Sequence, residues 1–364
     1  MKSVMLLTFR EFSFRSAGVK RSVHLRLMPF IGLVIMLSTV SCKDDDPQTG
    51  ETISFEQPAN FPSPVYQFND NGVTNNRFQL GRKLFYDPVL SLDNTISCGN
   101  CHLQKAAFSH VDHDVSHGIN NLLGTRNAPP IFNLAWHSNF FWDGGVNHLE
   151  LQPVNPIQNP VEMGESLAHV IAKLNGSTTY KTLFNEAYGS DSITSQMMLR
   201  ALAQFMAVLV SANSKYDRVM RNENGAQFTT EELNGLTLFR QKCASCHSEP
   251  LFTDLSYRNN GLDSVFSDLG RGLITLDPND NGKFKVPSLR NISVTYPYMH
   301  DGRIKTLSKV IDHYTSGIKS SPTLDPLLAN GILLSPQEKS DLLSFLQTLK
   351  DDSFLNNPSY SEIH

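Results

Sequence analysis

The sequence has little of several features that would place it in a simple class. Its 31 basic and 35 acidic residues leave a net charge of −4, so no basic surface for nucleic acid is expected. Only five of its 364 residues are cysteine, which excludes a small disulfide-dense domain. No long alternation of polar and apolar residues indicates a sheet, and the apolar run 27–37 is too short for an ordinary transmembrane helix. The length and the 40% hydrophobic content instead predict a globular protein of about two domains.

Four of the five cysteines stand in two C-x-x-C-H motifs. These are Cys98-Gly-Asn-Cys101-His102 and Cys243-Ala-Ser-Cys246-His247. Two thiols one helical turn apart can form thioether bonds to the vinyl groups of one porphyrin, and the adjacent histidine can then bind its iron. The motifs therefore predict two covalently bound c-type haems. Zinc held by four thiolates and a redox-active disulfide in either pair are the alternatives.

The fifth cysteine belongs to an N-terminal export signal. Residues 20–26 are basic, the apolar run 27–37 follows, and Ser38-Thr-Val-Ser-Cys42 resembles a bacterial lipobox. We expect residues 1–41 to be a lipoprotein signal peptide and Cys42 to carry the lipid. This lipid would be the protein's only membrane contact and would anchor it in the periplasm, at the outer membrane or at the cell surface. A plain signal peptide with an incidental Cys42 is the alternative.

Helical signals dominate the remaining chain. Residues 165–174 and 195–212 each place apolar side chains on one face at helical spacing. Thr229–Glu232 and Ser335–Glu338 have the capping-box pattern that starts a helix. The expected fold class is therefore mainly α, with two cytochrome c-like haem domains and long loops.

A weak internal repeat supports two similar halves. Leu80–Phe85 precedes the first haem motif, and Leu236–Phe239 precedes the second. The polar stretch 213–228 is the expected boundary. We therefore divide the mature chain into a tether over 42–62, an N-terminal haem domain over 63–220 and a C-terminal haem domain over 221–364.

Further segments occur in a specific order around the two motifs. They are Leu84–Pro88, Ser97–His102, Arg126–Pro129, Phe141–Gly144, Asn159–Gly164, Lys285–Asn291 and Tyr296–Gly302. With this set, the chain from about residue 77 to 350 resembles the bacterial dihaem cytochrome c peroxidase family, including its MauG-like branch. The resemblance implies a peroxidatic haem in the N-terminal domain and an electron-transfer haem in the C-terminal domain. His102 and His247 would be their axial ligands.

The resemblance also assigns roles around the haems. Trp142 matches the indole between the haems, and Gln152 and Glu162 match the distal-pocket pair. A distal carboxylate can take a proton from one peroxide oxygen and return it to the other, so Glu162 is the expected general base and acid. Gln152 would orient peroxide, and Trp142 would relay an oxidising equivalent. Without the resemblance, Glu162 reads as a surface carboxylate and Trp142 as a core aromatic.

Two further ligand assignments follow from the same resemblance. Asn127, Thr295 and Pro297 match the positions that hold a calcium ion between the domains. Calcium prefers oxygen ligands of this kind. His117 matches a loop histidine that caps the peroxidatic iron in many relatives, and its alternative is a solvent-facing histidine.

Tyr314 marks a departure from the peroxidases of this family. These usually have methionine fourteen residues after the position of His300, whereas the MauG-like branch has tyrosine there, as this chain does. A phenolate oxygen is a hard anionic donor and should lower the potential of the C-terminal iron relative to a thioether. Met299 and His313 are the alternative ligands.

Together these observations predict a dihaem c-type peroxidase that reduces hydrogen peroxide to water. Its electrons would come from a cytochrome c or another small redox protein. The first alternative is a MauG-like oxidase that acts on a protein or small molecule through a bis-haem high-valent state. The second is an electron-transfer dihaem cytochrome. The resemblance is also compatible with a homodimer.

Overall fold

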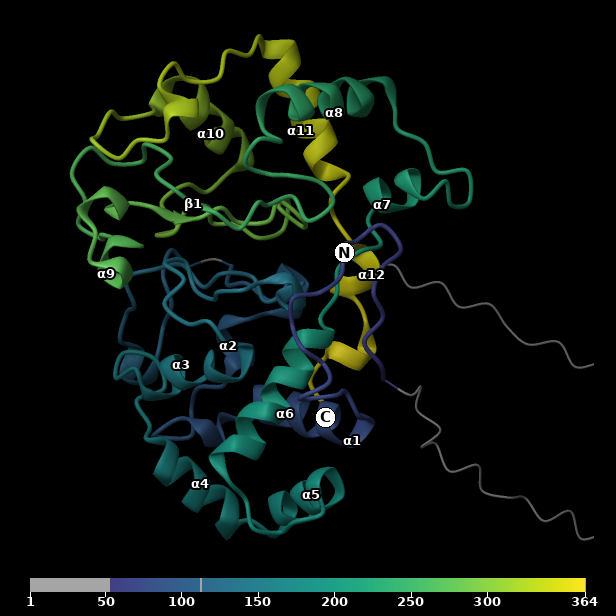
Figure 1. Ribbon diagram of the computed structural model, residues 1–364, viewed down its shortest axis with the longest axis vertical. Helices are drawn as coiled ribbons and strands as arrows, with labels where there is room; N and C mark the ends of the chain where they lie inside the picture. The colour runs from purple at the N-terminus through teal and green to yellow at the C-terminus, as the bar shows by residue number, and fades with distance from the viewer. Residues whose placement is uncertain (1–52, 112, 364) are drawn as a thin grey trace, which may run out of the picture. The chain divides into compact units, whose positions relative to one another are not determined.

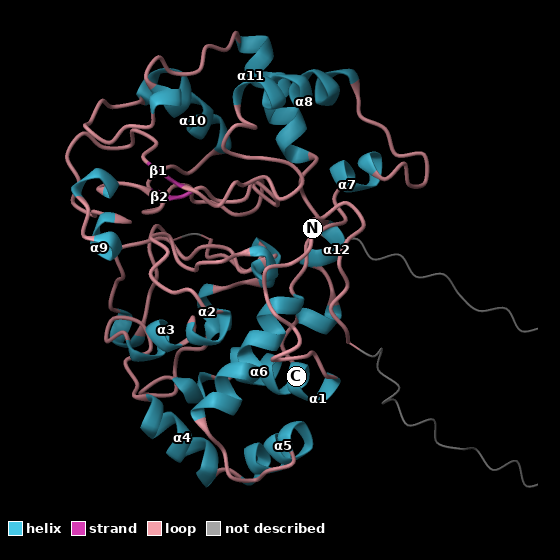
Figure 2. Ribbon diagram, in the orientation of Figure 1, coloured by secondary structure: helices cyan, strands magenta, loops and turns pink. Residues whose placement is uncertain are grey.

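The computed structural model describes residues 53–111 and 113–363. The expected signal peptide over 1–41 and the lipidation site Cys42 lie outside these residues. Helices joined by long loops make up the described chain, and strand is confined to a two-stranded ribbon (Figure 2). The mainly α fold class is therefore confirmed. Among the described residues, no helix combines the length and apolar character needed to cross a membrane.

The N-terminal lobe is built on two crossing helices. Its helices are α1 (Asn75–Tyr86), α2 (Cys98–Cys101), α3 (Val154–Gln158), α4 (Leu167–Gly176), α5 (Thr178–Tyr188) and α6 (Ser195–Val208). Helix α1 packs against α6 at Gly81, where an added Cβ would lie 2.0 Å from the carbonyl oxygen of Ala201. Glycine thus permits the close crossing that brings Phe85 and Phe205 together in the core.

The C-terminal lobe repeats this crossing. Its elements are α7 (Lys215–Met220), α8 (Thr230–Lys242), β1 (Tyr257–Arg258), α9 (Gly272–Thr275), β2 (Phe284–Lys285), α10 (Leu307–Asp312), a π-helical turn (His313–Gly317) and α11 (Pro336–Gln347). Helix α8 packs against α11 at Gly235, where an added Cβ would lie 2.0 Å from the carbonyl oxygen of Asp341 (Figure 1). The crossing brings Phe239 against Phe345, so both lobes have the same local construction.

The two predicted capping boxes are confirmed, whereas the ends of two helices differ from the sequence pattern. Thr229 and Ser335 each cap a helix as predicted. Helix α4 begins at Leu167 rather than Glu165, because the Ser166 side chain accepts the His169 amide hydrogen and caps the helix. The pattern over 195–212 ends as helix at Val208, so its last apolar residues lie beyond the helix.

Both ends of the described chain pack on the N-terminal lobe. Within the expected tether, Phe61 is buried against Trp136, whose indole N–H donates to the carbonyl of Pro62 at 2.7 Å. At the other end, α12 (Asp352–Leu355) inserts Phe354 and Leu355 into the N-terminal core. The C-terminal residues therefore complete the core of the lobe that begins the chain.

Candidate functional site

The first C-x-x-C-H motif opens into a cavity of about 680 Å³ in the N-terminal lobe. Cys98 and Cys101 stand one turn apart on α2. Ser97 and Asn100 form a capping box at the N-terminus of this helix. The turn continues far enough for the His102 amide to donate to the Cys98 carbonyl at 2.9 Å. All three side chains of the motif line the cavity.

The His102 ring is held in the form that a metal requires. Its Nδ1–H donates to the carbonyl of Phe108 at 2.7 Å, so Nε2 keeps its lone pair. Burial lowers the pKa of His102 to about 4, and the ring is neutral at physiological pH. Phe108 itself adopts a left-handed φ of 57°, which turns its carbonyl toward the histidine.

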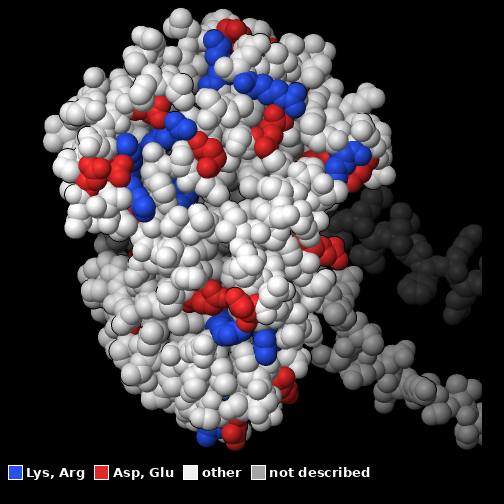
Figure 3. All heavy atoms as spheres, viewed as in Figure 1, with Lys and Arg blue, Asp and Glu red and all other residues white. Residues whose placement is uncertain are grey.

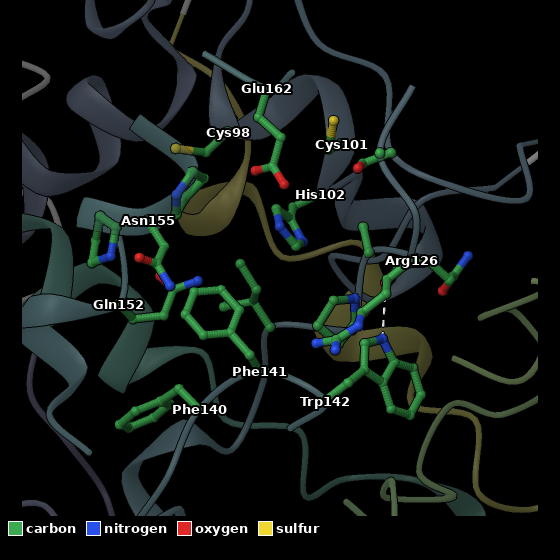
Figure 4. Close-up of a pocket in the computed structure, with 18 of the residues that line it drawn as sticks. Cys98, Cys101, His102, Arg126, Phe140, Phe141, Trp142, Gln152, Asn155 and Glu162 are labelled. Carbon is green, nitrogen blue, oxygen red and sulfur yellow. Dashed lines mark hydrogen bonds between the residues drawn. The ribbon is translucent and has the colours of Figure 1, made fainter. Parts of the chain in front are cut away.

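Glu162 and Gln152 lie in the same cavity as His102. The Glu162 carboxyl group points into the cavity between the two cysteines (Figure 4). Gln152, which stands just before α3, lines the same cavity. One amide hydrogen of Asn159 is donated to Glu162 Oε1 at 3.0 Å. Burial raises the pKa of Glu162, and this single hydrogen bond lowers it only in part. A buried carboxyl group with a shifted pKa in a cavity is a candidate for proton transfer.

His117 also lines this cavity and belongs to a cluster of three histidines. Its ring centroid lies 4.3 Å from that of His113, which stacks on His110 at 4.8 Å. The His117 loop packs against the Glu162 segment, because the Ile119 amide donates to the Glu162 carbonyl at 2.8 Å. His117 and Glu162 therefore lie close together in this cavity.

The second motif lines a cavity of about 550 Å³ in the C-terminal lobe. The His247 amide donates to the Cys243 carbonyl at 2.9 Å, as in the first motif. The His247 Nδ1–H lies 3.2 Å from the carbonyl of Phe252 and 3.1 Å from that of Pro287. Burial lowers the pKa of His247, which favours the neutral ring, and Nε2 of this ring also keeps its lone pair.

Tyr314 lines the second cavity from the π-helical turn. Burial raises the pKa of its hydroxyl to about 12, and the side chain of Asn260 hydrogen-bonds to it. Met299 also lines the cavity and accepts an amide hydrogen of Asn260 at 3.4 Å. His313 is not among the lining residues, and its Nε2 lies 3.0 Å from the Asn260 carbonyl. Tyr314 and Met299 are therefore better placed than His313 to reach a metal.

The two cavities share a wall. Trp142, Lys285, Val286 and Pro287 line both of them. The indole N–H of Trp142 donates to the carbonyl of Asn127 at 2.9 Å. Trp142 therefore lies in the wall between the two cavities.

The three expected calcium positions come from two segments that meet. The Asn127 amide donates to the carbonyl of His300 at 2.7 Å, which joins the segment of Asn127 to the one that contains Thr295 and Pro297. The Asn127 side-chain nitrogen donates to the Asp114 carbonyl at 3.3 Å, and no hydrogen bond of the described residues ends on the side-chain oxygen of Asn127.

The placement of the cysteines argues against a zinc ion held by all four thiols. The two pairs line different cavities, and no cluster of three or more His, Cys, Asp or Glu side chains in the described chain is arranged to hold a metal ion. Each cavity instead offers two thiols and a neutral histidine in a mostly apolar lining, which fits a covalently attached haem.

Comparison with known proteins assigns the chain to a family. Residues 75–225 match the family described as "Di-haem cytochrome c peroxidase", and residues 233–350 match "Cytochrome c". The chain is 37% identical over 303 residues to the methylamine utilization protein MauG of Methylorubrum extorquens, covering 81% of this chain and 83% of the relative. The chain belongs to the dihaem cytochrome c peroxidase family. It is therefore an oxidoreductase with two c-type haems.

Two more comparisons include both branches of this family. The chain is 33% identical over 282 residues to the cytochrome c551 peroxidase of Nitrosomonas europaea, covering 75% of this chain and 80% of the relative. Among solved structures, a MauG-like protein associated with microbial copper homeostasis superposes with a TM-score of 0.77 at 34% identity. That match covers 85% of this chain and 99% of the other.

Three residues of the two cavities had no role in the sequence analysis. Asn159 bonds Glu162, Asn260 contacts both Tyr314 and Met299, and Lys285 belongs to the shared wall. Asn159 and Lys285 stand inside segments that carry the family resemblance, which is the signal that could have drawn attention to them. Asn260 stands outside those segments, so nothing in the sequence marked it.

Proposed function

We propose that this protein reduces hydrogen peroxide to water in the N-terminal cavity. Electrons would enter through the C-terminal haem from a cytochrome c or another small redox protein. The observation that carries the proposal is the Glu162 carboxyl group, which points into the cavity lined by His102 and has a raised pKa. The peroxidases among the relatives support the same activity.

The residues of the cavity can perform the proton transfers that the reaction requires. A haem held by Cys98, Cys101 and His102 would supply the redox chemistry that cleaves the O–O bond of peroxide. Ionised Glu162 takes a proton from one peroxide oxygen and delivers it to the other oxygen, which departs as water. Gln152 holds peroxide in place by hydrogen bonds. Trp142, in the shared wall, provides an aromatic relay between the two cavities.

Peroxide turnover with reduced cytochrome c tests this proposal. Glu162→Gln removes the proton acceptor and should lower kcat by about 10² to 10⁴-fold, the usual contribution of general acid–base catalysis. Glu165→Gln is the matched control, because the Glu165 carboxylate pairs with Lys173 at 3.1 Å and does not line the cavity. It should lower the melting temperature and keep kcat. Full activity in haem-loaded Glu162→Gln would refute the catalytic role of Glu162.

A second candidate function rests on Tyr314. A phenolate ligand in the C-terminal cavity would lower the potential of that iron and make electron uptake from a cytochrome c less favourable. It would favour a MauG-like oxidase that acts on a partner protein or a small molecule. Peroxide consumption that reduced cytochrome c does not support would favour this function. No reaction with peroxide in any redox state would leave only electron transfer.

We further propose that the protein acts outside the cytoplasm. The basic, apolar and lipobox-like segments that end at Cys42 support export and lipid anchoring in the periplasm or at the cell surface. Acidic and basic side chains are interspersed on the face in Figure 3, as the small net charge suggests.

We also propose a calcium site and a homodimer. The junction of the Asn127 segment with that of Thr295 and Pro297 supports the calcium site. The homodimer is the assembly that the family resemblance suggests.

A further inference from the structure

The wall between the two cavities contains one charged side chain. Of its members Trp142, Lys285, Val286 and Pro287, only Lys285 carries a charge. Lys285 belongs to β2 and pairs with Tyr257 of β1, and its amide donates to the Trp142 carbonyl at 2.7 Å. The backbone of Lys285 is therefore fixed on both sides, and its position in the wall follows from the ribbon.

The Lys285 ammonium is buried, and no carboxylate of the described residues lies within ion-pair distance of it. The residue is 8% exposed, and its ammonium donates to the backbone carbonyl of Asn139. Asp143 attracts Lys285 electrostatically, but its carboxylate is held by Arg126 at 2.5 Å. Lysine is almost never buried unless it is paired, because removing the ammonium from water is costly. Burial accordingly lowers the pKa of Lys285 to about 8.

The surroundings of the ammonium place it toward the N-terminal cavity. The charged and titratable groups that act on it or feel its charge are Asp143, Arg271 and His137. His137 lines the N-terminal cavity, and burial together with the Lys285 charge lowers its pKa to about 3. An imidazole is neutral or cationic, so His137 cannot balance the ammonium in either form. Because Lys285 lines the N-terminal cavity, an anionic group bound in that cavity would supply the balancing negative charge.

We propose that the Lys285 ammonium binds a propionate carboxylate of the haem in the N-terminal cavity. Lys285 is then a positioning residue that completes its charge balance only when the haem is present. The ion pair raises the reduction potential of that haem, because a nearby positive charge favours the reduced iron. This inference rests on the haem content of the chain and is independent of the role proposed for Glu162.

The test is a potentiometric titration in which electron spin resonance assigns each haem. In haem-loaded Lys285→Met, the N-terminal haem should bind its electron at least tenfold more weakly, which is a downward shift of about 59 mV for one electron. Lys285→Gln should give the same shift, and Lys285→Arg should stay within about threefold of the wild type, because arginine keeps the charge. The C-terminal haem should shift less in each variant.

Lys283→Met is the matched control. Lys283 stands two residues earlier, pairs with Asp280 at 3.0 Å and lines neither haem cavity, so both potentials should stay unchanged. An unchanged N-terminal potential in either neutral Lys285 variant would overturn the proposal. If only Lys285→Arg acquires its haem, the charge is required and the proposal is supported. If all three Lys285 variants fail to acquire haem, the position serves packing and the proposal is wrong. Peroxide turnover is measured separately, so a failure here leaves the peroxidase proposal intact.

Discussion

The hydrogen bond from Asn159 to Glu162 should set the pH at which the enzyme becomes active. Glu162 acts as a base only when it is ionised, and burial raises its pKa above the ordinary value. Peroxidase activity should therefore be low while the carboxyl group is protonated and should rise as the pH increases through this raised pKa. Asn159 donates at 3.0 Å and opposes the effect of burial, so Asn159→Ala should raise the pKa of Glu162 further.

The expected displacement follows from that one bond. A hydrogen bond to a charged group contributes about 1.5–3 kcal/mol. One pKa unit corresponds to about 1.4 kcal/mol. The acid limb of kcat/KM for peroxide should therefore move to higher pH by about one to two units in Asn159→Ala. The rate on the alkaline plateau should change little, because the carboxylate itself is intact.

The assay is a pH profile of kcat/KM, with haem content measured for each variant. Gln158→Ala is the control, because Gln158 is an exposed neighbouring amide that lines the cavity without a hydrogen bond to Glu162 among the bonds of the described chain. It should leave the acid limb in place. An Asn159→Ala profile that coincides with the wild type would refute the proposed control of Glu162.

The same raised pKa predicts the sign of a stability change. The folded state favours protonated Glu162, so its contribution to stability is complete below the unfolded pKa. It is lost as pH rises through the folded pKa. Glu162→Gln removes this loss, so its melting temperature should exceed that of the wild type at neutral pH, with the difference vanishing at low pH.

Two further predictions concern the C-terminal lobe. Tyr314→Met should raise the potential of the C-terminal haem, and Met299→Leu should leave it unchanged; an unaltered potential and spectrum in Tyr314→Met would show that tyrosine is not the ligand. Gly235→Ala should lower the free energy of unfolding by about 1–3 kcal/mol in calorimetry or denaturant titration, because its Cβ would lie 2.0 Å from the Asp341 carbonyl oxygen. Gly176→Ala, with open space around it, is the control, and equal stability of the two variants would contradict the close helix crossing.

The sequence predicted the features that depend on short-range patterns. Capping at Thr229 and Ser335 is decided by residues three apart, and so is the spacing of the thiols of each haem motif. The motifs alone predicted haem attachment. The assignment of one haem as peroxidatic and the role of Glu162 needed the family resemblance as well. The structure brings Glu162, Gln152 and His102 to one cavity, although they are separated by up to sixty residues.

The features that the sequence did not reveal depend on contacts between distant loops. The ribbon that places Lys285 in the wall has only two residues in each strand. An alternation of polar and apolar residues is too short there to predict a strand. Asn260 meets Tyr314 and Met299 through loop geometry alone. The capping box at Ser335 indicated the start of α11 but not the helix that it packs against. The packing of Phe354 into the opposite lobe left no local signal.

The insertion of α12 into the N-terminal core has a consequence for how the protein is made. Gln104, two residues after the first motif, donates to the carbonyl of Asn357 at 2.8 Å, and Tyr86 donates to that of Tyr360 at 2.7 Å. A chain is synthesised from its N-terminus, so these partners emerge only after the C-terminal lobe. The core of the N-terminal lobe is therefore completed after the lobe that follows it has been made.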